Sequence, residues 1–262
     1  MRRYLSIWRA QLRYSFVREM MFKGNFLLWI VVELCWFALQ LTFVQVLYLK
    51  VDDVAGWTKW EMVLLVTTSH LVQQFFQCFL MANCMQIPEL IRSGRLDFFL
   101  AQPAHPQFLV STRLFEPGAL LNAAFAAGLC AYAFHRLHIA WSPLHVGIFA
   151  LLIGLGVLIH YSLMLSFMTL AFWMTRAQGF MTGYYQIFQI ARLPREAFTG
   201  FTRVFFTWII PMLLVANVPA QTLAKGPQAG QILALAALAV AGFAASSAFF
   251  RFGLSRYTSA SS

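Results

Sequence analysis

The most informative scarcity in this chain is that of charge. Only 11% of its 262 residues are charged, whereas 60% are hydrophobic and the mean hydropathy is +0.69. Soluble domains carry about 25% charged residues, so this chain cannot cover a water-facing surface in the ordinary way. The composition predicts an all-α polytopic membrane protein. The net charge of +10 does not indicate nucleic-acid binding, because most basic residues stand at the ends of apolar segments, where they suit anionic lipid headgroups.

Motifs of catalysis and of nucleotide hydrolysis are also lacking. The phosphate-binding pattern G-x-x-x-x-G-K-[ST] does not occur, and neither do H-E-x-x-H and G-x-S-x-G. The four cysteines lie within apolar stretches and form no C-x-x-C pair, so we interpret them as small core residues. Only nine acidic residues are present, which leaves few carboxylates for proton-coupled transport. We therefore expect no catalytic residue, no metal and no cofactor bound by this chain.

Long apolar segments predict six transmembrane helices, because about 20 apolar residues cross a bilayer of roughly 30 Å. We place these spans at 25–49, 61–84, 108–134, 145–175, 179–223 and 231–250. In front of them, residues 1–23 intersperse arginines with large apolar side chains, which predicts an amphipathic helix lying in the headgroup region. The remainder, 24–262, is expected to form a single transmembrane domain.

The segment 179–223 allows two interpretations. It is either a single crossing by residues 201–223, or a short crossing from Gly179 followed by a hairpin that is broken at Pro194, Pro211 and Pro219. We favour the crossing with a re-entrant hairpin. Four charged residues in this region are costly in lipid and are expected to face protein or water: Arg192, Arg195, Glu196 and Arg203.

Basic residues indicate the orientation. They favour the N-terminal side of the membrane by about three to one, so the positive-inside rule predicts that both termini are cytoplasmic. The loop 85–107 between the second and third spans is then cytoplasmic as well. It combines a helix start at Pro88, a helix stop at Gly94 and charges of both signs. A helix of barely two turns is not stable alone, so we interpret this segment as a docking loop, with an ordinary interhelical turn as the alternative.

Polar residues within the spans are the candidates for a substrate path. In the second span, four residues share one helix face by their i, i+3, i+4, i+7 spacing: His70, Gln73, Gln74 and Gln77. These residues either line a path for a substrate or lie where two subunits meet. The alternative is that they make interhelical hydrogen bonds, each worth about 1 kcal/mol. In the first span Glu33 and Gln40 also share a face. A carboxylate at this depth is costly and indicates a functional site with a buried Arg or His partner. The path candidates are Glu33, Gln40, His70, Gln73 and Gln77.

Three further signals have structural interpretations. Arg113 and Glu116 lie one turn apart, which favours a salt bridge. His160 stands alone on an apolar segment, as a hydrogen-bonded core histidine does. The three histidines near the second outside turn lack a nearby cysteine or carboxylate, so we do not expect them to bind a metal.

The docking loop has a resemblance to a known family. Its sequence I-P-E-L-I-R-S-G-R-L-D-F-F-L-A-Q-P-A-H-P resembles the loop after the second span in six-span permeases of ABC-2 type exporters, closest to the viologen-exporter-like branch. Further segments match the same permeases in layout, namely Trp173–Arg176, R-L-P-R-E-A-F and I-I-P-M-L-L-V-A-N-V-P-A. The resemblance implies two permeases paired with two cytoplasmic ATPases that bind ATP and Mg, and a re-entrant hairpin before the last span. It also implies that the loop is a coupling helix, whose residues are Pro88, Glu89, Leu90, Ile91, Arg92, Gly94, Arg95 and Asp97.

We therefore expect the non-enzymatic permease subunit of an ATP-driven ABC exporter in a bacterial cytoplasmic membrane. Its partners would be ATPase subunits, a second permease, identical or paralogous, and membrane lipids, but not nucleic acid. The alternatives are a membrane enzyme acting on lipid, and an ion-coupled secondary transporter or channel. No residue indicates the cargo.

Overall fold

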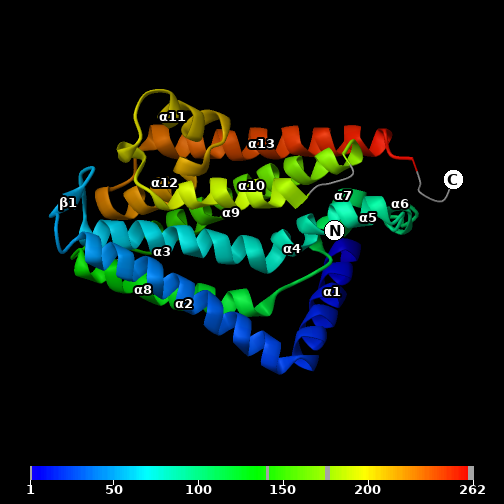
Figure 1. The fold of residues 1–262 in the computed structure, drawn as a ribbon, viewed down its shortest axis with the longest axis horizontal. Coiled ribbons are helices and arrows are strands. Elements are labelled where there is room, and N and C mark those ends of the chain that lie inside the picture. Colours follow the sequence, from blue (N-terminus) through cyan, green and yellow to red (C-terminus); the bar gives the residue numbers. More distant parts are fainter. Residues whose placement is uncertain (1, 140–141, 175–177, 259–262) are drawn as a thin grey trace.

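Long apolar helices lie nearly parallel along one axis of the molecule (Figure 1). The computed structural model describes residues 2–139, 142–174 and 178–258. Five helical runs are long and apolar enough to cross a membrane: α2 (Lys23–Leu47), α3 with its continuation to Arg92 (Lys59–Arg92), α8 (Pro117–Arg136), α9 with its continuation (Pro143–Phe172) and α13 (Ala229–Ser255). A bent helix pair in 200–225 provides a sixth candidate. The prediction of an all-α polytopic membrane protein is confirmed.

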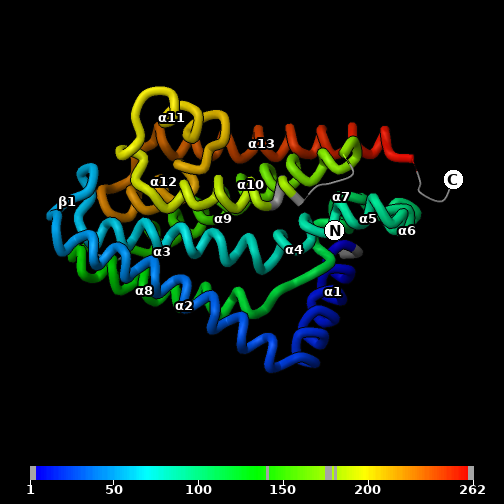
Figure 2. The backbone as a smooth tube through the Cα atoms, viewed as in Figure 1, coloured from blue at the N-terminus to red at the C-terminus, as the bar shows by residue number. Residues whose placement is uncertain are grey.

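The two ends of the bundle differ in structure. At one end, here called the hairpin end, β1 (Asp53–Val54) and β2 (Trp57–Thr58) form a small antiparallel hairpin that the sequence did not predict. Its turn places Ala55 and Gly56 at positive φ, 55° and 76°. At the other end, here called the loop end, lie both chain termini and the connection between α3 and α8 (Figure 1). The helix α1 (Arg2–Met21) leaves this end at a steep angle to α2, as the backbone trace in Figure 2 shows.

The connection at the loop end is almost entirely helical. From α3 (Lys59–Phe76) the chain continues through the π-helical turn η1 (Gln77–Met81) and α4 (Ala82–Met85) into α5 (Ile87–Arg92). Two further short helices follow, α6 (Leu96–Leu100) and α7 (Pro106–Thr112).

The predicted third span, 108–134, is not one helix. It is divided between α7 and α8, and the chain is unwound at 113–116. The break has a local cause, because Pro117 has no N–H and Glu116 donates its own N–H to the Cys78 carbonyl of η1, at 2.9 Å. The span therefore begins about nine residues later than its hydropathy indicated.

The segment 178–225 contains one bent helix pair, 200–209 with 212–225, and the favoured interpretation of a crossing followed by a re-entrant hairpin stays a prediction. It comprises α10 (Gln178–Gln189), η3 (Ile190–Arg192), η4 (Arg195–Ala197), α11 (Gly200–Val204), η5 (Phe205–Ile209) and α12 (Met212–Lys225). The chain bends by 85° between Ile209 and Met212. The predicted break at Pro219 is wrong, since Pro219 lies inside α12. The fourth span consists of α9 (Pro143–Thr169) and η2 (Leu170–Phe172); its predicted end at residue 175, and Arg176, lie outside the described residues.

The central helices are α3 and α12, and α2 is peripheral. In the most apolar stretch of the run Lys59–Arg92, which contains α3, 72% is buried. The corresponding share is 17% for α2 and 22% for α13. In α12, every residue from Met212 to Thr222 is buried. Only Ile30, Phe37 and Val44 of α2 are buried, at intervals of seven residues. One narrow seam thus holds α2 to the bundle, and its other residues are half-buried or exposed.

Candidate functional site

The short helix α5 divides its residues between the bundle and the outside. Ile87 and Leu90 are buried in the core cluster at the loop end, and α5 packs against η2 and α9. On the outer side, Glu89 pairs with Arg92 at 2.7 Å and with Arg95 at 3.6 Å. These side chains are between 45% and 70% exposed, so their pairing adds little stability and leaves them accessible to a partner.

The ends of α5 follow the sequence prediction with one difference. Gly94 has a φ of +68° just beyond the helix, a conformation that favours glycine. Pro88 was predicted at the first helical position, but α5 begins at Ile87 and Pro88 occupies the second. Because no N–H of the first turn has a partner inside the helix, proline is tolerated there equally well.

A buried amide fastens the base of the loop. Asn83 donates from Nδ2 to the Leu114 carbonyl at 2.8 Å and accepts the Leu114 N–H on Oδ1 at 2.7 Å. Next to it, Arg113 donates to Gln86 and lies 5.4 Å from the centre of the Phe99 ring. Burial lowers the pKa of Arg113, and two neighbouring arginines lower it further.

One predicted side-chain contact at the loop end differs in the structure. The salt bridge between Arg113 and Glu116 is wrong, because Glu116 contacts Gln77 while Arg113 turns to the loop. Asp97 lies beside Tyr257 in the chain beyond α13, and burial together with the Asp97 carboxylate raises the pKa of that tyrosine. The loop is thus joined both to its own base and to the C-terminal segment.

The polar stripe of α3 is buried and points to α2. His70 and Gln74 are 1% and 0% exposed, and their Nε2 atoms lie 3.2 Å apart. The His70 ring stacks on Phe37 with 4.0 Å between centroids. Gln74 Nε2 lies 3.5 Å from a carboxylate oxygen of Glu33, which is half-buried. Spacing alone thus identified the residues that meet between the two helices.

Arg192 completes this network, and its role was not identifiable from local sequence. Its guanidinium donates to Gln73 Oε1 at 2.6 Å and to Gln189 Oε1 at 2.8 Å. It also stacks over Phe188 at 5.3 Å and interacts with the charge of Glu33. An Arg or His partner for Glu33 was expected, but no spacing rule connects positions 33 and 192.

Two cavities open between α2 and α3, and both reach Tyr185 of α10; the first also reaches the start of α8. One, of about 590 Å³, lies toward the loop end and the other, of about 720 Å³, toward the hairpin end. Both are lined by Glu33, Gln73 and Tyr185, so these residues stand where the cavities adjoin. Gln77 lines the first cavity, whereas Gln40 and His70 line the second. All five path candidates therefore face one side of the bundle.

The structure around His160 agrees with a structural role for this histidine. His160 is fully buried and its Nδ1 lies 2.7 Å from the Tyr184 hydroxyl, as a hydrogen-bonded core histidine requires. Within the described ranges, no group of three or more His, Cys, Asp or Glu side chains is placed to hold a metal ion.

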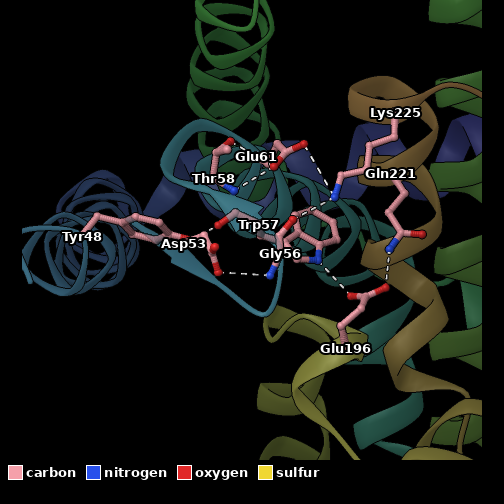
Figure 3. Close-up of polar contacts among 9 residues, drawn as sticks. All are labelled: Tyr48, Asp53, Gly56, Trp57, Thr58, Glu61, Glu196, Gln221 and Lys225. Atoms are coloured by element: carbon pink, nitrogen blue, oxygen red, sulfur yellow. Dashed lines mark hydrogen bonds and ion pairs between the residues drawn. The ribbon is translucent and has the colours of Figure 1, made fainter. Parts of the chain in front are cut away.

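A second polar cluster closes the hairpin end, and Figure 3 shows its members converging from three segments. Glu196 accepts a hydrogen bond from the Trp57 indole at 2.9 Å and one from Gln221 at 2.8 Å. Lys225 donates to the Gly56 carbonyl at 3.1 Å and lies 3.7 Å from the Glu61 carboxylate. The β-hairpin with the start of α3, the short helix η4 and the far end of α12 are joined in this way.

The comparisons with known proteins agree with this architecture. Residues 34–261 match the model of a family described as ABC-2 family transporter protein. No curated protein and no solved structure matches the chain. The match begins inside α2 and extends through α13, so it covers every other candidate span and the whole connection at the loop end. The chain therefore belongs to the ABC-2 family of transporter proteins and is a membrane-embedded permease component of an ABC transporter.

Proposed function

We propose that this permease serves an ATP-driven exporter, and that α5 with its following turn docks onto a separate cytoplasmic ATPase. The observation that carries the proposal is the division of α5: an apolar side packed into the bundle and a charged side, Glu89, Arg92 and Arg95, facing outward. A partner that binds the charged side and displaces the helix would also displace its apolar side, and with it the core residues that contact that side. The family membership supports the role of a partner ATPase, since ABC transporters use ATP.

The route for that motion is continuous. Helices α3, η1, α4 and α5 follow one another almost without interruption from Lys59 to Arg92. A partner that contacts α5 differently in two nucleotide states would bias the position of α3, because only differential contact shifts an equilibrium. The π-helical turn Gln77–Met81 lies within this path, and such turns are frequent at functional sites.

The cargo path in this proposal runs along the two cavities beside α2. Their polar lining is centred on Glu33, Gln73 and Arg192, while large exposed apolar residues cover the other faces of α2. A second permease, identical or paralogous, would close the open side. Polar side chains then flank a path inside the pair rather than facing lipid, where they are costly. In this arrangement the loop end, with both termini, is cytoplasmic and the membrane is the bacterial inner membrane.

The first experiment is affinity purification of the chain from native membranes in mild detergent, with mass spectrometry of the proteins retained. We expect a stoichiometric ATPase that carries a phosphate-binding loop. The double variant Glu89→Ala/Arg92→Ala should lose it, while Lys50→Ala, an exposed lysine at the hairpin end, should retain it. Because the Glu89 and Arg92 side chains are exposed, their removal should not affect membrane insertion.

Two outcomes would contradict the proposal in different ways. An ATPase retained equally by both variants would place the docking surface elsewhere. A chain that is purified alone, repeatedly, would favour a lipid enzyme or an ion-coupled transporter; turnover by the single chain or ion-driven uptake into ATP-free vesicles would then distinguish these two. Bis-maleimide crosslinking through Cys35, the one cysteine of the four that is exposed, tests for an identical second permease; Cys35→Ser is the control.

A further inference from the structure

A third cavity lies on the edge of the bundle opposite α2. It has a volume of about 630 Å³ and opens between α7, α9 and α13 near the loop end. Helix α13 runs along this edge, far from α2 in Figure 1. None of the path candidates lines this cavity, so it is separate from the cavities beside α2.

The floor of this cavity is polar and already hydrogen-bonded. Gln107 donates from Nε2 to the Tyr161 hydroxyl at 3.0 Å and to Ser247 Oγ at 2.9 Å. The Ser111 hydroxyl lies 2.9 Å from the same tyrosine oxygen. All four side chains are buried. An occupant made only of hydrocarbon does not match this floor, because the floor presents hydroxyl and amide groups to whatever fills the cavity.

The walls are apolar and shaped by small residues. Ala244 and Ala248 are exposed on α13 one turn apart, and they leave a groove beside Phe243, which is 41% exposed. Phe108 of α7 and Leu158 of α9 line the opposite side. The groove therefore suits an acyl chain that lies along α13.

The position along α13 matches the boundary of a bilayer. Helix α13 starts at Ala229 at the hairpin end, so at 1.5 Å per residue Ser247 lies about 27 Å along the helix and Arg251 about 33 Å. The hydrocarbon core is about 30 Å thick. With the start of α13 placed at the opposite edge of the hydrocarbon core, Ser247 and the polar floor reach the depth of glycerol esters and Arg251 reaches the depth of phosphates.

The rim of the cavity carries positive charge without a compensating carboxylate. Arg251 lines the cavity and is exposed, and it makes no ion pair or hydrogen bond with the described residues. His105 lies on the same rim, and no lining residue is acidic. A guanidinium binds a phosphate with two parallel hydrogen bonds. Because the rim has no carboxylate, a choline cation beside that phosphate would find no partner there, so a headgroup of net negative charge is favoured over a zwitterionic one.

We propose that this cavity binds one anionic phospholipid of the leaflet at the loop end. The phosphate binds Arg251, the ester and glycerol oxygens contact the floor at Ser247 and Gln107, and one acyl chain lies in the alanine groove against Phe243. The site is independent of the cargo path and of the docking helix, so it stands whether or not the proposed export function is correct.

The test is a lipid titration of the full-length chain, purified in detergent, followed by native mass spectrometry. We expect one tightly bound phosphatidylglycerol per chain and weaker binding of phosphatidylcholine. Arg251→Gln should weaken phosphatidylglycerol binding about fivefold and phosphatidylcholine binding by less, since a basic residue at the surface contributes about that factor for a lipid of net negative charge. Arg256→Gln removes the same charge near the end of the same helix but does not line the cavity, and should change nothing.

A second variant tests the groove without altering charge. Ala248→Phe fills it from an exposed position, so folding is unaffected and binding of both lipids should fall. Equal affinity of the wild-type chain for the two lipids would overturn the proposal. Equal losses in Arg251→Gln and Arg256→Gln would overturn it too, because they would show general attraction to charge, and so would undiminished binding by Ala248→Phe.

Discussion

The indole N–H of Trp57 donates a hydrogen bond of 2.9 Å to the carboxylate of Glu196, 139 positions further along the chain (Figure 3). Trp57 is fully buried, and Lys225 lies 5.0 Å from the centre of its ring. Through Trp57, the strand β2 therefore contacts both η4, at Glu196, and the last residue of α12, Lys225. The hairpin end is closed by this contact rather than by a long loop.

We expect Trp57→Phe to loosen that end. The substitution keeps a large buried ring but removes the N–H, so Glu196 loses one of its two hydrogen bonds. A hydrogen bond to a charged group contributes about 1.5–3 kcal/mol, which should appear as a lower thermal unfolding temperature in detergent. Trp29→Phe on the exposed face of α2 is the control and should unfold like the wild type. Equal unfolding temperatures for all three proteins would show that the Trp57 contact contributes nothing.

Two glycines of α9 have opposite surroundings, so Gly154 can serve as the control for a substitution at Gly156. A Cβ added at Gly156 would lie 3.2 Å from Val215 of α12, both its side chain and its carbonyl oxygen, and 3.2 Å from Val72 of α3. Gly154 is exposed and has nothing within 4 Å. We expect Gly156→Ala to destabilise the protein by about 1–3 kcal/mol through overpacking, and Gly154→Ala to stabilise it by up to about 1 kcal/mol through helix propensity. Thermal unfolding measures both, and a stabilised Gly156→Ala would refute the close approach.

Asn83 is predicted to hold the base of the docking loop. Replacing it with alanine leaves the N–H and the carbonyl of Leu114 without partners, and each unsatisfied group costs about 1–3 kcal/mol. We expect faster proteolysis and faster hydrogen exchange over 83–116 in Asn83→Ala. Asn25→Ala, at an exposed position near the start of α2, should exchange as the wild type does. Unchanged exchange in both variants would contradict the prediction.

A double-mutant cycle tests the contact between Gln73 and Arg192. The two residues are joined by a hydrogen bond of 2.6 Å between segments 119 positions apart. We expect Gln73→Ala and Arg192→Ala to be coupled by about 0.5–3 kcal/mol in unfolding free energy, the range for residues in contact. Gln40 and Arg192 line the same cavity without a hydrogen bond between them, so this pair should give a coupling near zero. Additive effects in both cycles would show that the hydrogen bond is not formed in the membrane protein.

Local pattern was sufficient for much of this molecule. The helix period placed His70 and Gln74 on one face, and that face meets Glu33. The need for positive φ after a short helix identified Gly94. Prolines and charges indicated a broken fifth segment, and α11 and α12 form it. Each of these inferences depends on residues within about two helical turns of one another, where steric and hydrogen-bonding rules act directly.

The features that were missed depend on distant residues. At the unwound stretch 113–116, Pro117 has no N–H, and Glu116 donates its N–H to the carbonyl of Cys78, a residue of η1 that is 38 positions away. Arg192 meets Gln73, and Trp57 meets Glu196, only after the helices have packed. The prolines also predicted a break of the hairpin at Pro219, but Pro219 lies inside α12, where packing overrides that preference.

Pro219 has a further consequence at the centre of the bundle. It has no N–H for the carbonyl of Val215, and this carbonyl faces Gly156, the point of α9 without a side chain. Sliding α12 along α9 would bring that carbonyl against residues that have side chains, so we expect the two helices to resist sliding and to move together. Rearrangement at the hairpin end is then confined to the two flanks of α12. These are the 85° corner at Ile210–Pro211 and the turn at Gly226, whose φ is +87°.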